Sequence, residues 1–276
     1  MAAALFSFIL MAVAGRELAG QISTFQILFF RSAIGVVLIG ILIWMTGVSQ
    51  LKTTRIKAHL GRNFAHFAGQ YGWFYGLGVI SLAEVIALEF TTPVWTAILA
   101  AIFLHERLTA ARWMVLVFGI AGLFLILRPG AGVIHPAALA VLAGAAGYAC
   151  SYIFTKSLSA TETPLSILFY MTLLQLPLGF FPALADWKTP EGDQWLWVVV
   201  VGVSALTAHY CMTRAFRLAD AGVVVPMDFL RLPLIAVVGY LFYNEALDLW
   251  VLLGAALMFS GNLINLRAEL KRLRAH

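Results

Sequence analysis

The second half of this chain repeats the first half at a fixed offset of 139 residues. Each half contains five apolar segments, and several uncommon residue types coincide between the halves without a gap. The coinciding pairs are Thr24 and Thr163, Tyr71 and Tyr210, Glu89 and Asp228, Glu106 and Glu245, Gly122 and Gly261, and Arg128 and Arg267. Because five is an odd number, the two halves must cross a membrane in opposite senses. Inverted repeats of this kind are typical of secondary transporters.

The composition predicts that the chain is integral to a membrane. Of its 276 residues, 62% are hydrophobic and 11% are charged, whereas soluble domains average about 45–50% apolar and about 25% charged residues. A spanning helix needs about 20 apolar residues, so ten spans use most of the chain. They leave no room for a separate soluble catalytic domain.

We therefore predict an all-α integral membrane protein with ten transmembrane helices. The helices form two inverted five-helix repeats around a central cavity, in residues 1–132 and 133–276. The expected spans are 2–20, 24–46, 60–80, 82–104, 110–128, 136–157, 164–185, 194–216, 221–243 and 248–267. Only about 14 apolar residues precede Arg16, so either the first helix continues past this charge or further residues lie upstream.

The basic residues gather on one side of this layout. With the N-terminus inside, 13 of the 18 Lys and Arg residues lie on the cytoplasmic side, in loops, in the C-terminal tail or at the cytoplasmic ends of the spans, and three lie on the opposite side. This positive-inside bias predicts cytoplasmic termini in a bacterial inner membrane. It also accounts for the net charge of +5, so we expect the lipid bilayer, rather than nucleic acid, as the partner of these charges.

Four charged residues lie deep inside the expected spans. Arg31 and Glu89 lie on different helices at similar depth from the outer side, and Asp228 and Arg231 lie one turn apart on the ninth helix. Charges at bilayer depth are costly unless they are paired or hydrated, so all four are candidate substrate-binding residues. Arg31 and Glu89 are placed to meet as an ion pair, and Asp228 and Arg231 are placed to neutralise each other locally. For each pair the alternative is a structural salt bridge that holds helices together. A desolvated Glu89 or Asp228 is a candidate proton carrier.

Three prolines lie close to the two acids. Pro93 lacks the amide that would bond the Glu89 carbonyl, and Pro226 and Pro233 bracket Asp228. Kinked helices beside intramembrane charges are typical of moving gates. We therefore predict that the three prolines are hinges, although proline is frequent in membrane helices generally.

Four further residues are predicted to line the cavity. Gln70 and Tyr71 lie in the third expected span, Tyr148 in the sixth and Tyr210 in the eighth. Aromatic side chains with a few polar groups suit an amphipathic metabolite. Packing between helices is the alternative for each of them.

The sequence predicts neither a cofactor nor a metal centre. His66 and His209 lie in mated spans, but no third ligand has supporting spacing. ATP-driven transport is unsupported, because the chain contains no GxxxxGK[ST] motif. The sequence leaves open whether the protein is a monomer or a homodimer.

Several motifs resemble those of the EamA-type transporters in the drug/metabolite transporter superfamily. They are TFQILFFRS at 24–32, EFTTP at 89–93, FLHE at 103–106, DFLRLP at 228–233 and FYNE at 242–245. The resemblance covers essentially the whole chain. It implies a ten-helix bundle with a central cavity and alternating access. The branches that look closest include S-adenosylmethionine and riboflavin uptake proteins, beside amino-acid exporters.

These observations together predict a secondary active transporter and not an enzyme. The expected substrate is a small polar or amphipathic metabolite, such as an amino acid or a nucleoside-like or vitamin-like solute, moved by proton coupling or by exchange. The alternative is an integral membrane enzyme that modifies a lipid or a lipid-linked substrate. Such an enzyme would need acids or histidines clustered at one membrane face, and the sequence offers no such cluster.

Overall fold

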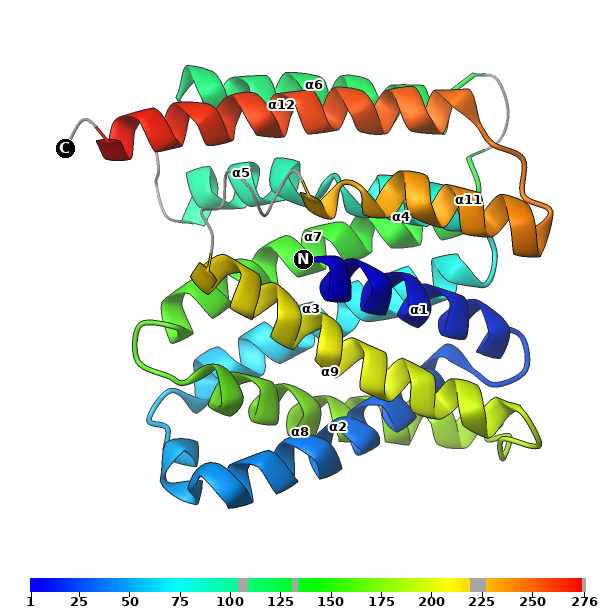
Figure 1. Ribbon diagram of the computed structural model, residues 1–276, viewed down its shortest axis with the longest axis vertical. Coiled ribbons are helices and arrows are strands. Elements are labelled where there is room, and N and C mark those ends of the chain that lie inside the picture. Colours follow the sequence, from blue (N-terminus) through cyan, green and yellow to red (C-terminus); the bar gives the residue numbers. More distant parts are fainter. Residues whose placement is uncertain (104–108, 131–133, 219–226, 275–276) are drawn as a thin grey trace.

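The computed structural model describes residues 1–103, 109–130, 134–218 and 227–274 as a bundle of long helices joined by short connections (Figure 1). The helices are α1 (Ala2–Leu18), α2 (Thr24–Thr46), α3 (Ile56–Leu77), α4 (Leu82–Glu89), α5 (Thr92–Phe103), α6 (Ala110–Leu127), α7 (Pro136–Leu158), α8 (Pro164–Ala183), α9 (Gln194–Leu218), α11 (Arg231–Tyr243) and α12 (Leu249–Arg274). Two short 3-10 turns, η1 (Val48–Leu51) and η2 (Leu184–Asp186), follow α2 and α8. The expected helix at 24–46 is reproduced residue for residue by α2.

Seven helical stretches in the described part of the chain are long and apolar enough to cross a membrane. They are Thr24–Thr46, Leu82–Phe103, Ala110–Leu127, Pro136–Leu158, Pro164–Asp186, Gln194–Met212 and Leu249–Ala268. The other three expected spans correspond to α1, to α3 and to α11, which are short or carry polar residues. The predicted all-α membrane architecture is confirmed, whereas the count of ten spans stays a prediction.

The distribution of side chains is that of a protein surrounded by lipid. Large apolar residues face outward, and Trp44 on α2 is 80% exposed. Polar residues are instead buried between helices, among them Gln26, His66 and Gln175. The interior is mainly apolar but contains these polar side chains, while large apolar residues also cover the outside, as expected for a helix bundle in lipid.

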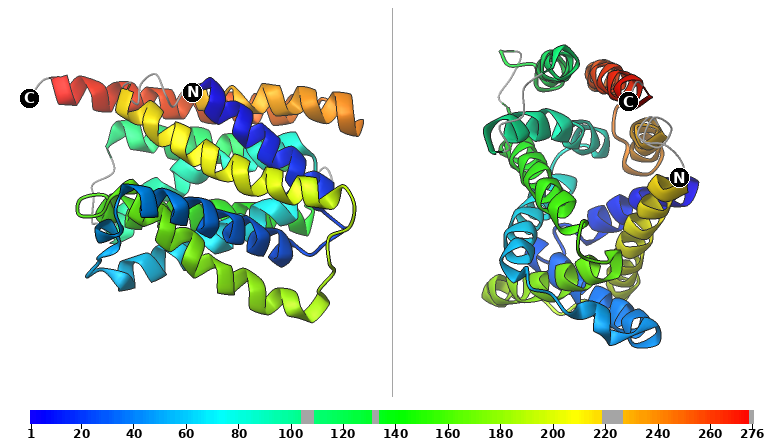
Figure 2. Two further views of the ribbon diagram at one scale, coloured as in Figure 1. Left: turned by 60° about the horizontal axis from the view of Figure 1, so that its bottom comes forward. Right: turned by 90° about the vertical axis from the view of Figure 1, so that its left-hand side faces the viewer.

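Helix packing follows the 139-residue offset. Helix α3 packs along α7, and the mates of these helices, α9 and α1, also pack along each other. Helix α2 packs along its own mate α8, and α6 along its mate α12. The α6–α12 pair forms one edge of the bundle and the α2–α8 pair lies near the opposite edge (Figures 1 and 2).

Glycines bring these helices close together. A Cβ atom at Gly144 on α7 would lie 2.8 Å from the carbonyl oxygen of Gly69 on α3. A Cβ atom at Gly254 on α12 would lie 2.6 Å from the carbonyl oxygen of Gly122 on α6. Small residues at such crossings let helix backbones touch, which is how membrane helices pack without a hydrophobic driving force.

The fourth expected span is a broken helix, and the described part of the ninth span is interrupted as well, whereas we predicted continuous kinked helices. The first break lies at Phe90 and Thr91, between α4 and α5. The second break lies at Phe229 and Leu230, directly before α11. The two breaks are 139 residues apart, so they occupy equivalent positions in the two halves.

The prolines explain where the new helices begin. Pro93 is the second residue of α5 and Pro233 is the third residue of α11. An amide in the first turn of a helix has no partner within the helix, so proline is tolerated there. Each proline therefore begins a helix rather than bending one. Pro226 lies outside the described residues.

Candidate functional site

The break between α4 and α5 is stabilised by two threonine hydroxyls. The Thr92 hydroxyl donates to the carbonyl oxygen of Glu89 at 2.6 Å, which is the carbonyl that Pro93 leaves without an amide donor. The Thr91 hydroxyl donates to the carbonyl oxygen of Leu88 at 2.7 Å. Unbonded backbone groups are costly in a membrane interior, so these bonds let α4 end there and present the Glu89 side chain.

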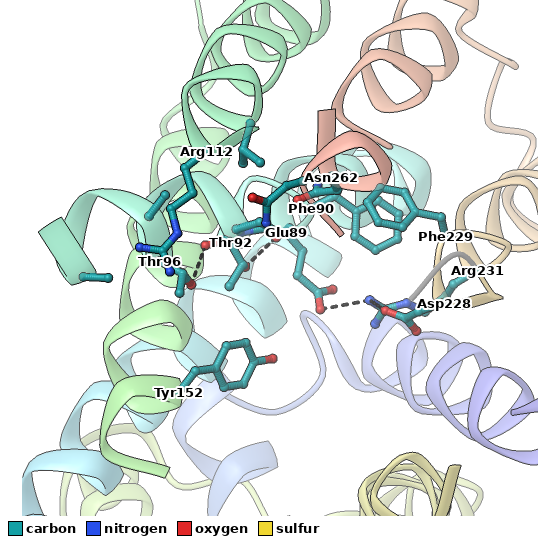
Figure 3. Close-up of a pocket in the computed structure, with 15 residues that line it drawn as sticks. Glu89, Phe90, Thr92, Thr96, Arg112, Tyr152, Asp228, Phe229, Arg231 and Asn262 are labelled. Carbon is teal, nitrogen blue, oxygen red and sulfur yellow. Dashed lines mark hydrogen bonds and ion pairs between the residues drawn. The ribbon is translucent and has the colours of Figure 1, made fainter. Parts of the chain in front are cut away.

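Arg231, the first residue of α11, joins the two broken helices. Its Nη2 atom lies 3.1 Å from Oε1 of Glu89 and 3.3 Å from Oδ2 of Asp228 (Figure 3). The second oxygen of Glu89 accepts a hydrogen bond from the Trp73 indole at 2.8 Å. One cation therefore faces two carboxylates, and the group carries a formal charge of −1.

Aromatic rings enclose this charged group. The guanidinium carbon of Arg231 lies 4.8 Å from the ring centre of Phe8 and 5.3 Å from that of Phe90. Such cation–π contacts stabilise a desolvated guanidinium. The rings of Phe90 and Phe229, which are repeat mates, lie 4.2 Å apart. The two breaks thus meet through both an ion pair and a pair of rings.

A cavity of about 400 Å³ begins at the two breaks. Its lining comprises Glu89, Phe90, Thr92, Pro93, Thr96, Ala97, Ala100, Arg112, Val115, Tyr152, Asp228, Phe229, Arg231, Asn262 and Asn265. Tyr152 reaches toward it from α7, while Arg112 and Asn262 lie at its α6 and α12 sides (Figure 3). A volume of this size suits a small organic molecule.

A polar network closes the opposite end of the bundle. Arg16, in the last turn of α1, forms an ion pair with Glu245 and donates to the carbonyl oxygen of Ile80 at 2.8 Å. The other oxygen of Glu245 accepts the Leu82 amide at 2.9 Å. This network ties the end of α1 to the α3–α4 connection and to the segment that follows α11. Helix α1 continues past Arg16, which agrees with the first of our two expectations for this span.

Arg31 does not pair with Glu89, so this expectation was wrong. Its side chain is 4% exposed and has no ion-pair partner among the described residues. Helix α2 packs against α8 and α9 rather than against α4, and Arg231 occupies the carboxylate that we had assigned to Arg31.

A second arginine lies near Arg31 and was not among our predicted site residues. Arg62 on α3 is 6% exposed and donates to the Thr155 hydroxyl at 2.8 Å and to Oδ1 of Asn63 at 2.9 Å. We had counted Arg62 with the cytoplasmic charges. The signal that would have revealed it is a stripe of His59, Arg62, His66 and Gln70, which share one face of α3 at helical spacing.

Three of the remaining predicted residues, Gln70, Tyr71 and Tyr148, lie within the bundle. Gln70 is buried, and the ring of Tyr148 lies 5.4 Å from that of His66. Tyr71 packs on Phe25, with 4.6 Å between ring centres.

Tyr210 lies apart from the other predicted residues, on the surface of α9 with 53% of its area exposed. Pro93 lines the cavity, whereas Pro233 lies on an exposed face of α11. Phe90, Phe229, Asn262 and Asn265 also line the cavity, although the sequence singled out none of them as a binding residue.

Comparisons with known proteins agree with this architecture. The model of the EamA-like transporter family matches the chain twice, at residues 1–128 and 135–267. An S-adenosylmethionine uptake transporter of Rickettsia bellii is 28% identical over 94% of this chain and 89% of its own length. A riboflavin transporter of Rhizobium johnstonii is 33% identical over 83% of this chain and 76% of its own length.

A solved structure shows the same fold. A crystal structure that shares 19% sequence identity superposes with a TM-score of 0.65 and covers 99% of this chain and 98% of the other. The predicted function, a small-metabolite transporter, is confirmed by the family and by the two relatives, and nothing supports the membrane-enzyme alternative. This multi-pass membrane protein belongs to the EamA-like transporter family.

Proposed function

We propose that this protein takes up a zwitterionic metabolite that carries an aromatic ring, with S-adenosylmethionine as the leading candidate. The observation that carries the proposal is Arg231 held between Glu89 and Asp228 where two broken helices meet. An ammonium or sulfonium group of the solute can replace the guanidinium beside a carboxylate. The rings of Phe90 and Phe229 offer apolar faces for an adenine ring.

Transport proceeds by alternating access between the halves 1–132 and 133–276. With both termini in the cytoplasm of a bacterial cell, the cavity opens toward the cytoplasm and the Arg16–Glu245 network faces the outside of the inner membrane. The two helix breaks, with Pro93 and Pro233 in the helices that follow them, are the hinges. Pro226, which precedes the second break in the sequence, is the third hinge candidate. Discontinuous helices at the membrane midplane serve this role in other secondary transporters.

The energy comes from protons or from exchange of one solute for another. Glu89 and Asp228 are the candidate proton carriers, because a carboxylate that loses its cationic partner inside a membrane favours the protonated form. One chain holds all the residues of the site, so a single subunit is sufficient for transport, whether the protein is a monomer or a homodimer.

Riboflavin is the second candidate. The riboflavin transporter of Rhizobium johnstonii has the higher identity, although over less of the chain, and the aromatic residues of the cavity suit a flavin ring. A neutral vitamin, however, gives no reason for buried charges at both helix breaks. We therefore rank it below a zwitterion.

The test is uptake of labelled S-adenosylmethionine and of labelled riboflavin into proteoliposomes. Each solute is measured with and without a pH gradient, and with and without unlabelled solute inside. We expect saturable uptake of S-adenosylmethionine that falls about tenfold or more in Glu89→Gln. Glu84→Gln is the matched control, because Glu84 lies on the same helix and is absent from the cavity lining. Uptake of riboflavin alone, or of neither solute, would reject the proposal.

A further inference from the structure

Two buried arginines, Arg31 and Arg62, have no carboxylate partner among the residues that the structure describes. Arg62 contacts only neutral groups, namely the Thr155 hydroxyl, the Asn63 amide oxygen and the sulfur of Met171 at 3.9 Å. Arg31 makes no hydrogen bond within the described chain, and its buried Nε atom has no partner. The two guanidinium groups interact electrostatically with each other.

This arrangement differs from that of the other arginines inside the bundle. Arg231 faces two carboxylates, and Arg16 forms an ion pair with Glu245. A buried ion that lacks a partner is costly, and two ions of the same sign are costlier still. Within the described residues, both arginines are therefore buried without an acidic side chain to neutralise them.

Neutral polar groups lie beside Arg62 and its neighbour Asn63. The side-chain amide nitrogen of Gln175 lies 3.0 Å from Nδ1 of His66 and 3.4 Å from Oδ1 of Asn63. The amide oxygens of Gln175 and Gln70 are buried without a partner in the described chain. Such a lining is polar enough to hold an ion or water, but it contributes no negative charge.

The arginine pair is also connected to the cavity. Tyr152 on α7 lines the cavity. Arg62 donates to the hydroxyl of Thr155, three residues later on the same helix. Helix α7 therefore links the region of the arginine pair to the cavity.

We propose that Arg31 and Arg62 form an anion subsite that binds the carboxylate or phosphate group of the transported solute. The subsite rests on the proposed transport function and deepens it, because it divides the binding region into two ends. Arg31 and Arg62 hold the anionic group, while Glu89 and Asp228 hold the cationic group. Arg231 is less suited to the anion, because Asp228 still faces it when the solute's cation replaces it beside Glu89. Solutes without an anionic group bind weakly.

Two pairs of probes that differ by one anionic group test the subsite. The first pair is S-adenosylmethionine and its decarboxylated analogue, and the second is flavin mononucleotide and riboflavin. Affinities are measured by ligand-induced thermal shift on the purified full chain. Whichever pair binds, we expect its anionic member to bind about tenfold to a hundredfold more tightly than the other member. This is the range for a charge-assisted hydrogen bond.

Arg31→Gln and Arg62→Gln are the diagnostic variants. Each variant should lose most of the preference for the anionic probe. Its affinity for the probe that lacks the anionic group should stay within about twofold of the wild-type value. Lys57→Gln is the matched control, because it removes an exposed cation from the same helix as Arg62 and should leave the preference intact. Equal losses for both probes of a pair, or no loss for either, would overturn the subsite.

The melting temperature of an Arg31 variant distinguishes an anion subsite from a structural role for this residue. Because the two charges are unneutralised, Arg31→Met should raise the melting temperature of the ligand-free protein. A structural role predicts a lower melting temperature, which would contradict the subsite. If the wild type fails to transport S-adenosylmethionine yet prefers flavin mononucleotide over riboflavin through Arg31 and Arg62, the subsite stands and the proposed solute falls.

Discussion

The Thr92 hydroxyl donates a hydrogen bond to the carbonyl oxygen of Glu89 at 2.6 Å, across the gap between two helices. This bond replaces the amide that Pro93 lacks, and it places the end of α4 beside Arg231. The Thr92 side chain therefore stabilises the break, and it can be substituted without altering any charge.

Thr92→Val should destabilise the protein. Valine keeps the shape of threonine but leaves the Glu89 carbonyl unbonded, at a cost of about 1–3 kcal/mol. Thr92→Ser keeps the hydroxyl and is the control. The measurement is thermal unfolding of both variants in the same detergent. Equal melting temperatures for the valine and serine variants would show that the hydroxyl is not needed at the break.

Arg231→Gln should be more destabilising than Glu89→Gln. Removal of the arginine leaves two carboxylates facing each other, whereas removal of one carboxylate leaves Arg231 paired with Asp228 at 3.3 Å. Breaking a buried ion pair costs about 3–5 kcal/mol.

The triple variant Glu89→Gln/Asp228→Asn/Arg231→Gln contains no charge at this position and should recover part of the loss. Melting temperatures of the single and triple variants measure this coupling. Additive losses across the variants would contradict it.

The network opposite the cavity should control access from that side. Glu245 accepts from both Arg16 and the Leu82 amide, so Glu245→Gln removes the charge that attracts Arg16. We expect faster labelling of a cysteine at Ile80, which is buried beneath the network, by a membrane-impermeant thiol reagent.

The labelling is performed after Cys150 and Cys211, both free thiols, have been replaced by serine. Ile80→Cys is compared with and without Glu245→Gln, and a cysteine at the exposed Trp187 controls for reagent access. An unchanged labelling rate at position 80 would show that the network does not hold that side closed.

The sequence predicts where helices lie better than it predicts what their side chains meet. Hydropathy and capping residues define a span such as 24–46, because each depends on neighbouring residues only. The partner of Glu89 depends on how far each helix is rotated and on which helices pack together, so residue depth alone favoured Arg31 over Arg231. Arg62 was counted with the cytoplasmic charges because a charge near a helix end also fits the positive-inside pattern.

Gly254→Ala should weaken the contact between α6 and α12. A Cβ atom at position 254 would lie 2.6 Å from the carbonyl oxygen of Gly122, and this backbone atom cannot move aside as a flexible side chain can. Overpacking of this kind typically costs about 1–3 kcal/mol. The two helices form one edge of the bundle and pack mainly along each other, so the loss should fall on this edge.

Gly40→Ala is the matched control for this packing. Position 40 lies inside α2, and a Cβ atom there would meet nothing within 4 Å. Alanine favours a helix over glycine by about 0.5–1 kcal/mol, so Gly40→Ala should leave the melting temperature unchanged or raise it. Gly254→Ala should lower it under the same conditions. If both substitutions raise the melting temperature, helix propensity outweighs the backbone contact and α12 has room to shift away from α6.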